Sequence, residues 1–96
     1  MLRRREETLK KVLMTMLRED GLETPLNEYR AQQAWYDVMG HFTARYTASV
    51  SVQGGVMQVA LTNAALRQEL MMNRTAIIMR INNSVGAQVI QQLIIR

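Results

Sequence analysis

Few side chains in this 96-residue chain could take part in covalent or metal chemistry, and none has the spacing that such chemistry needs. His41 is the only histidine and cysteine is absent, which rules out a cysteine nucleophile, a disulfide scaffold and a cysteine-based zinc site. Nothing in the spacing pairs His41 with a serine and an acid as a catalytic triad would require, and the glycines form no phosphate-binding motif. After residue 33 the only acids are Asp37 and Glu69, too few for catalysis by paired carboxylates. The sequence therefore predicts a binding module without enzymatic activity, metal, cofactor or small-molecule substrate.

Basic side chains are the stronger indication of function. The net charge is +4, and residues 34–96 hold five basic and two acidic side chains. A surface poor in carboxylates suits nucleic acid or an acidic protein face, and the guanidinium fork of arginine matches phosphate. The candidate nucleic-acid-binding residues form one group near the N-terminus and a second group in a predicted helical segment: Arg3, Arg4, Arg5, Lys10 and Lys11, then Arg67, Arg74 and Arg80.

The arginines of the second group and two aromatic residues can each be interpreted in two ways. On a continuous helix Arg67 and Arg74 would share one face, being seven residues apart, and Arg80 would drift away from it. A solvated helix face with no ligand is the other interpretation of these three residues. Phe42 and Tyr46 could stack on bases, although burial in the core is the expectation for both aromatic side chains.

Two helices are predicted in the first part of the chain. Residues 6–19 carry apolar side chains at helical spacing, with Glu6 and Glu7 expected in the first turn: the stripe is Leu9, Val12, Leu13, Met16 and Leu17. We expect this stripe to pack on the core of its own domain, with a surface for another protein as the alternative. A second helix is predicted over residues 26–39, ending at Gly40, with Trp35 buried as a core anchor.

A β-hairpin is the clearest local prediction. Apolar and polar residues alternate over 44–53 and again over 57–61, and Gly54-Gly55 stands between them. Two adjacent glycines supply the positive φ angles that a type I′ turn requires. The hairpin is therefore predicted over residues 44–62.

A helical segment and a final strand complete the predicted fold. Asn63 is a good N-cap for helix 64–83, a break near residues 73–75 is plausible for so long a segment, and Gly86 ends it. The chain end at 87–96 is rich in Ile and Val, which favours a third strand, parallel to its partner through a right-handed crossover. The order α-α-β-β-α(α)-β predicts an α+β fold with helices packed on one face of a three-stranded sheet.

Several segments, in order, resemble a known family. They are Ala34-Trp35-Tyr36-Asp37-Val38-Met39-Gly40, Gly54-Gly55-Val56-Met57-Gln58-Val59, the helix start Asn63-Ala64-Ala65-Leu66-Arg67-Gln68-Glu69-Leu70, Ile81-Asn82-Asn83 with Gly86, and the closing residues Val89 to Arg96. Over residues 24–96 the chain resembles the DciA-like family. The resemblance implies a KH-like fold of the second type, α-β-β-α-α-β, and a role in bacterial DNA replication, with contacts to DNA and to the replicative helicase.

One departure from the KH pattern bears on how DNA would be held. A nucleic-acid-binding KH domain uses a G-x-x-G loop between its two central helices. Here that loop would be Met71-Met72-Asn73-Arg74, which has no glycine. Any contact with DNA must therefore come from side-chain charge.

Two functional hypotheses stay open at this point. The first is an accessory protein of DNA replication that binds DNA weakly and without sequence preference. The second is a protein–protein adaptor or homodimer with no direct role at nucleic acid. No run of about 18 apolar residues suggests a membrane span and no signal peptide is evident, so we expect a cytoplasmic protein with an N-terminal helical segment, 1–23, and a KH-like domain, 24–96.

Overall fold

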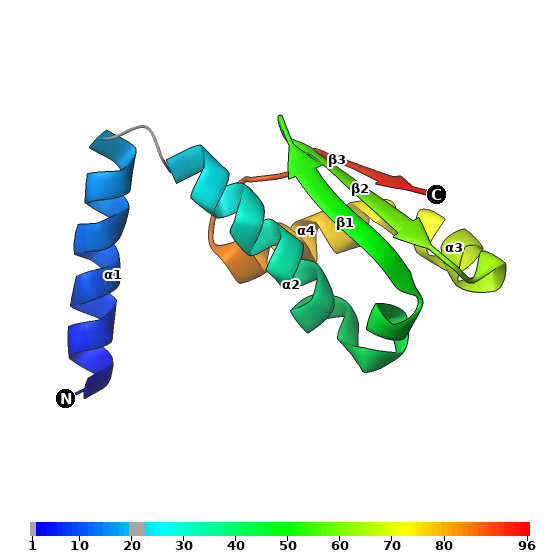
Figure 1. Cartoon of the computed structure of the whole chain (residues 1–96), viewed down its shortest axis with the longest axis horizontal. Helices are drawn as coiled ribbons and strands as arrows, with labels where there is room; N and C mark the ends of the chain where they lie inside the picture. The colour runs from blue at the N-terminus through cyan, green and yellow to red at the C-terminus, as the bar shows by residue number, and fades with distance from the viewer. Residues whose placement is uncertain (1, 20–22) are drawn as a thin grey trace.

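Four helices and a three-stranded mixed sheet make up the fold. A computed structural model describes residues 2–19 and 23–96, with side chains over 4–15 and 24–96. In chain order the elements are α1 (Leu2–Glu19), α2 (Glu23–Arg45), β1 (Thr47–Gln53), β2 (Val56–Leu61), α3 (Ala64–Met71), α4 (Arg74–Val85) and β3 (Gln92–Ile95). This order confirms the predicted α+β class, and α2, α3 and α4 pack against the sheet in a KH-like arrangement (Figure 1).

The sheet confirms both the hairpin and the third strand. β1 pairs antiparallel with β2, and β3 runs parallel to β2, so β2 is the central strand. Gly54 and Gly55 have φ angles of 58° and 81°, the sign that a two-residue hairpin turn needs. The carboxylate of Glu28, from α2, accepts a hydrogen bond of 2.9 Å from the Gly54 amide and ties the turn to that helix.

Helix α2 is longer than predicted because the chain becomes helical again beyond its break. Gly40 interrupts it with φ 83° and ψ 179°, far from helical values. The prediction places the break at the correct residue. It is wrong that the helix ends there, because residues 41–45 form a further helical turn. His41 is exposed on this turn.

The segment 64–83 is broken into α3 and α4, close to the predicted place. The Oδ1 atom of Asn63 accepts from the amide of Leu66 at 2.9 Å, which is the expected N-cap. Gly86, with φ 82°, ends α4 in the left-handed conformation that favours glycine. The break at residues 72–73 lets α4 turn back and pack beside α2.

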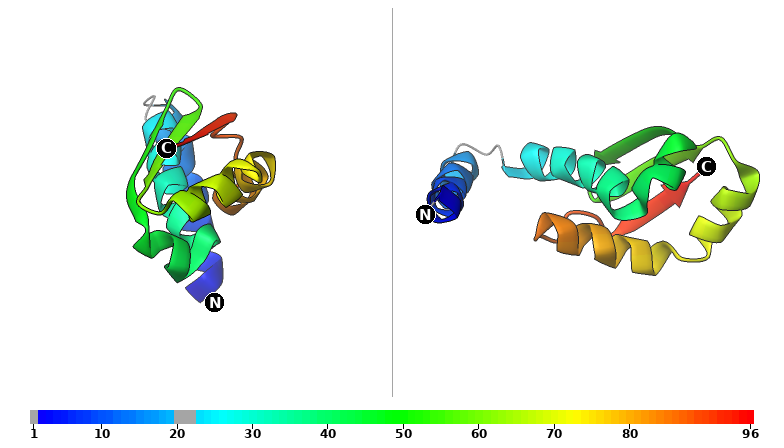
Figure 2. Two further views of the ribbon diagram at one scale, coloured as in Figure 1. Left: turned by 90° about the vertical axis from the view of Figure 1, so that its right-hand side faces the viewer. Right: turned by 90° about the horizontal axis from the view of Figure 1, so that it is seen from below.

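The core lies between the sheet and the layer formed by α2 and α4, which lie side by side in Figure 2. Trp35 is fully buried, as predicted, together with Met57, Val59, Ile81 and Ile90. Its indole Nε1 donates to Thr47 Oγ1 at 3.2 Å, and that hydroxyl donates to the Thr43 carbonyl at 2.7 Å. These bonds fasten the end of α2 to the start of β1.

Helix α1 does not bury its described apolar stripe, so the expectation that this stripe joins the core is wrong. Leu9, Val12 and Leu13 are 68%, 51% and 51% exposed. Met14 is half-buried, and at 100° per residue it lies on the opposite side of the helix. The side chains of Met16 and Leu17, the rest of the predicted stripe, lie outside the described residues. The described part of the core closes between the sheet, α2 and α4, and the three described stripe residues stay outside it. The helix also begins at Leu2, four residues before the prediction, so Glu6 and Glu7 are not in its first turn.

Candidate nucleic-acid interface

The first group of predicted residues lies on α1 as an exposed set of cations. Arg4, Arg5, Lys10 and Lys11 are all exposed, whereas the side chain of Arg3 lies outside the described residues. Thr8 Oγ1 donates to the Arg4 carbonyl at 2.9 Å, a bond within the helix. Within the described part of the chain, none of these four cationic side chains makes a hydrogen bond, and all four are exposed to a ligand.

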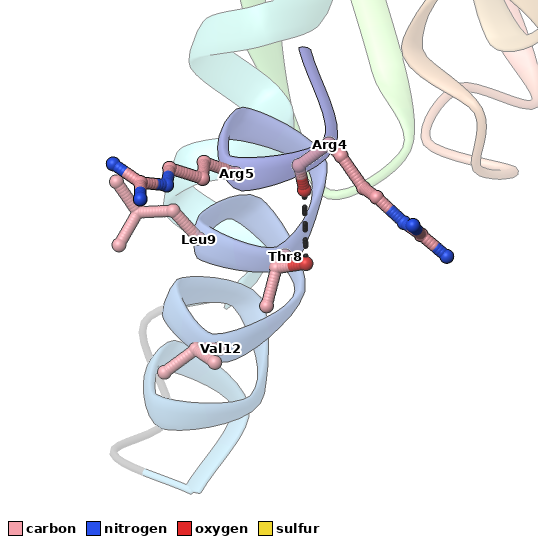
Figure 3. A pocket seen from close by; sticks show the side chains of 5 residues that line it. All are labelled: Arg4, Arg5, Thr8, Leu9 and Val12. Atoms are coloured by element: carbon pink, nitrogen blue, oxygen red, sulfur yellow. Dashed lines mark hydrogen bonds between the residues drawn. The ribbon is translucent and has the colours of Figure 1, made fainter. Parts of the chain in front are cut away.

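Figure 3 shows how charge and apolar surface meet on α1. The side chains of Arg5, Leu9 and Val12 extend to one side of the helix, and Arg4 extends to another. An open hollow is lined by Arg4, Arg5, Thr8, Leu9 and Val12. All five come from one helix, so this is a helix surface that joins apolar and basic side chains and not an enclosed cavity.

The second predicted group is divided between two helices. Arg67 is on α3, and Arg74 and Arg80 are on α4, so the seven-residue spacing of Arg67 and Arg74 does not place them on one helix face. Arg74 is exposed at the first position of α4. The three side chains do not form one surface.

Arg67 and Arg80 each make a bond to the protein's own backbone. Arg67 Nη2 donates to the Leu61 carbonyl at 3.1 Å, and its Nε is buried with no partner among the described residues. Arg80 Nη2 donates to the Val38 carbonyl at 3.0 Å. Because Gly40 interrupts the helical ladder, carbonyls just before it lose regular partners, and Arg80 supplies a donor to one of them.

Two further arginines gather where the sheet ends, and sequence reasoning missed both. Thr47 at the start of β1 pairs with Leu61 at the end of β2, and the Leu61 amide donates to the Arg96 carbonyl at 2.7 Å. This row brings Arg45, just before β1, and Arg96, just after β3, to the end of the sheet where Arg67 contacts Leu61. The predicted sheet topology could have identified them, since a hairpin followed by a parallel third strand places the start of the first strand and the end of the third at the same end of the sheet.

Phe42 and Tyr46 complete this sheet-end cluster, defined as Phe42, Arg45, Tyr46, Arg67 and Arg96. Phe42 is 65% exposed and Tyr46 is half-buried, with ring centroids 5.3 Å apart and ring planes at 63°. The expectation that both would be buried is therefore wrong for Phe42. Gly40 redirects the chain before Phe42, so this ring lies on a helical turn outside the packed layer.

The turn between α3 and α4 lacks the means of a KH backbone grip. Met72 is 77% exposed, Asn73 has φ −116°, and no residue there has the positive φ of a glycine turn. Asn73 Nδ2 donates to the Glu69 carbonyl at 2.9 Å and caps α3. The turn presents methionine side chains and Arg74, so any contact made by this turn is still expected to come from side chains.

A comparison with known protein families shows which family the chain belongs to. The family described as "Dna[CI] antecedent, DciA" matches residues 8–95, from within α1 to the end of β3. The chain belongs to the DciA family. Membership supports a role in DNA replication of the helicase-loader kind, in agreement with the resemblance carried by its motifs. No curated protein matches the chain.

None of the described helices is both long enough and apolar enough to cross a membrane. Within residues 2–19 and 23–96, no three His, Cys, Asp or Glu side chains come together as metal ligands.

Proposed function

We propose that this chain is a non-enzymatic accessory protein of bacterial DNA replication, which binds DNA weakly and without sequence preference and contacts the replicative helicase in the cytoplasm. The observation that carries the proposal is the family match over residues 8–95. The fold adds exposed cations on α1 and at the start of α4.

DNA binding is supported by the cations of α1. Side chains 4–15 of this helix include four basic and two acidic residues, and all six charged side chains are exposed. Exposed arginine and lysine neutralise phosphates without reading sequence. Arg3, whose side chain is outside the described residues, is proposed with this group, and Arg74 adds a cation at the α3–α4 turn.

Arg67 and Arg80 have a smaller part in the proposed DNA contact. Each already donates to a backbone carbonyl of the domain, which fixes the guanidinium in place. They contribute positive charge to the surface, while the contacts with phosphate fall mainly to the α1 cations and Arg74.

A titration of labelled DNA fragments of unrelated sequence tests this proposal. Changing Arg4, Arg5, Lys10 and Lys11 together to glutamine should weaken binding to every fragment by a similar factor, because phosphate contacts carry no sequence information. Arg30→Gln, which changes a half-buried cation of α2 that belongs to neither group, is the control and should leave affinity near that of the unchanged protein. Equal loss in both variants would contradict the assignment to α1.

The exposed apolar stripe of α1 favours a second candidate function, that of a protein–protein adaptor or homodimer. Leu9, Val12 and Leu13 present an apolar face that the domain does not cover, and a face of this kind suits a partner protein. The same stripe can serve the proposed helicase contact. Absence of binding to both single- and double-stranded DNA at low salt would leave the adaptor function as the better account.

A further inference from the structure

The sheet-end cluster combines the two kinds of side chain that hold unpaired nucleotides. Phe42 offers an exposed ring, and Arg45 is an exposed cation three residues along the same helical turn. Arg96, also exposed, follows β3 at the end of the sheet where its carbonyl accepts from the Leu61 amide. Proteins that bind single strands join aromatic rings, on which bases stack, to positive side chains that follow the backbone. Neither Arg45 nor Arg96 belongs to the groups discussed under the proposed function.

The position of Phe42 is fixed by the structure around it. Tyr46 packs against it at 5.3 Å in an edge-on arrangement. Tyr46 is itself held by its backbone, since its carbonyl accepts from the Thr62 amide at 2.9 Å and its amide donates to the Thr43 carbonyl at 3.1 Å. An exposed ring on so constrained a turn is preorganised for stacking, because little conformational freedom is lost on binding.

The charged side chains assigned to the sheet-end cluster are all positive. Arg45 precedes β1 and Arg96 follows β3, the two strands on either side of β2, whose backbones lie about 10 Å apart at the usual strand spacing. Arg67 donates to the carbonyl of Leu61 at the end of β2. Of the two acids after residue 33, Asp37 lies beside Ser84 and Val85 on α4, before the break at Gly40. Glu69 is on α3, about 200° around the helix from Arg67.

We infer that the sheet-end cluster is a stacking site for an unpaired base of DNA, with Phe42 under the base and Arg45 and Arg96 on the adjacent phosphates. This inference rests on the proposed DNA binding and adds the kind of DNA and the place where it is held. A paired base in a duplex has both faces covered by its neighbours, so Phe42 selects single-stranded DNA or an opened end.

The test compares two oligonucleotides of equal length and charge, oligo-dT and an abasic strand that lacks bases, bound to the full chain. Stacking of one base is worth about 1–3 kcal/mol, so oligo-dT should bind at least about fivefold more tightly than the abasic strand. Phe42→Leu should remove that preference and leave abasic binding unchanged, and Phe42→Tyr should retain it. Tyr29→Leu, which alters an aromatic residue that is 59% exposed elsewhere on α2, should also retain it.

Each result bears on the inference. Equal, salt-dependent binding of the two strands by the unchanged protein would overturn the stacking site and leave the proposed function standing. A preference for oligo-dT that survives Phe42→Leu would also overturn it. Failure to bind either strand, or duplex DNA, at low salt would overturn the inference and the proposed DNA binding together.

Discussion

At the scale of single residues, Asn82 is a buried polar side chain whose hydrogen bonds hold the segment between α4 and β3. It is 4% exposed, and its Oδ1 accepts from the amides of Val89 and Ile90, both at 3.0 Å. Its Nδ2 donates to the Ile90 carbonyl at 2.8 Å. One amide side chain thus takes the place of missing backbone partners where the chain leaves α4 and approaches β3.

Replacing Asn82 with leucine should lower the free energy of unfolding by about 2–4 kcal/mol, because buried amide and carbonyl groups would lose partners at about 1–3 kcal/mol each. Urea unfolding followed by circular dichroism measures the change. Asn83→Leu alters the exposed neighbour and should stay within about 0.5 kcal/mol of the unchanged protein. Equal stability of the two variants would show that water replaces these bonds without cost.

The arginines show why residue type alone did not define the interface. Arg67 and Arg80 looked equivalent to Arg74 in the sequence, yet each is bonded to a carbonyl of another element. The path of the chain decides which arginine is bonded in this way. Arg80 bonds to Val38, just before the break at Gly40, and Arg67 bonds to Leu61, at the end of β2. Arg45 and Arg96 join one surface only because β1 and β3 flank β2.

At the scale of elements, strong local signals predicted most of the fold. The alternation on both sides of Gly54-Gly55 predicts a hairpin. The Asn63 side chain caps the start of α3, and Gly86 ends α4 because it adopts a positive φ angle. The extension of α2 past Gly40 was not predictable in this way, because a glycine with positive φ can end a helix or only redirect it. The sequence also shows that α1 is amphipathic, but periodicity does not say which surface covers the apolar stripe.

Removal of residues 1–22 should leave the rest of the chain folded. The described apolar residues of α1 remain exposed, and the core closes between the sheet, α2 and α4, so we expect a change in unfolding free energy below about 1 kcal/mol. Thermal unfolding of the shortened chain, compared with the full chain, checks this. A loss of cooperative unfolding would mean that the α1 stripe packs on its own domain after all.

At the scale of the whole molecule, the proposed DNA contacts fall on two separate surfaces, with Arg74 apart from both at the α3–α4 turn. One is the projecting helix α1, and the other is the end of the sheet in the packed domain (Figure 1). In our account, α1 supplies charge to any DNA, and the sheet-end cluster adds a preference for unpaired bases. Since both surfaces act mainly through phosphate contacts, salt should weaken both.

The salt dependence of DNA affinity therefore tests the central claim most directly. Each phosphate neutralised on duplex DNA lowers the logarithm of affinity by about 0.9 per unit of the logarithm of salt concentration, so three to five contacts predict a slope of about −3 to −4.5. The variant with Arg4, Arg5, Lys10 and Lys11 changed to glutamine should give a flatter slope, and Arg30→Gln should not. A slope near zero, or no binding at low salt to single- or double-stranded DNA, would contradict the account.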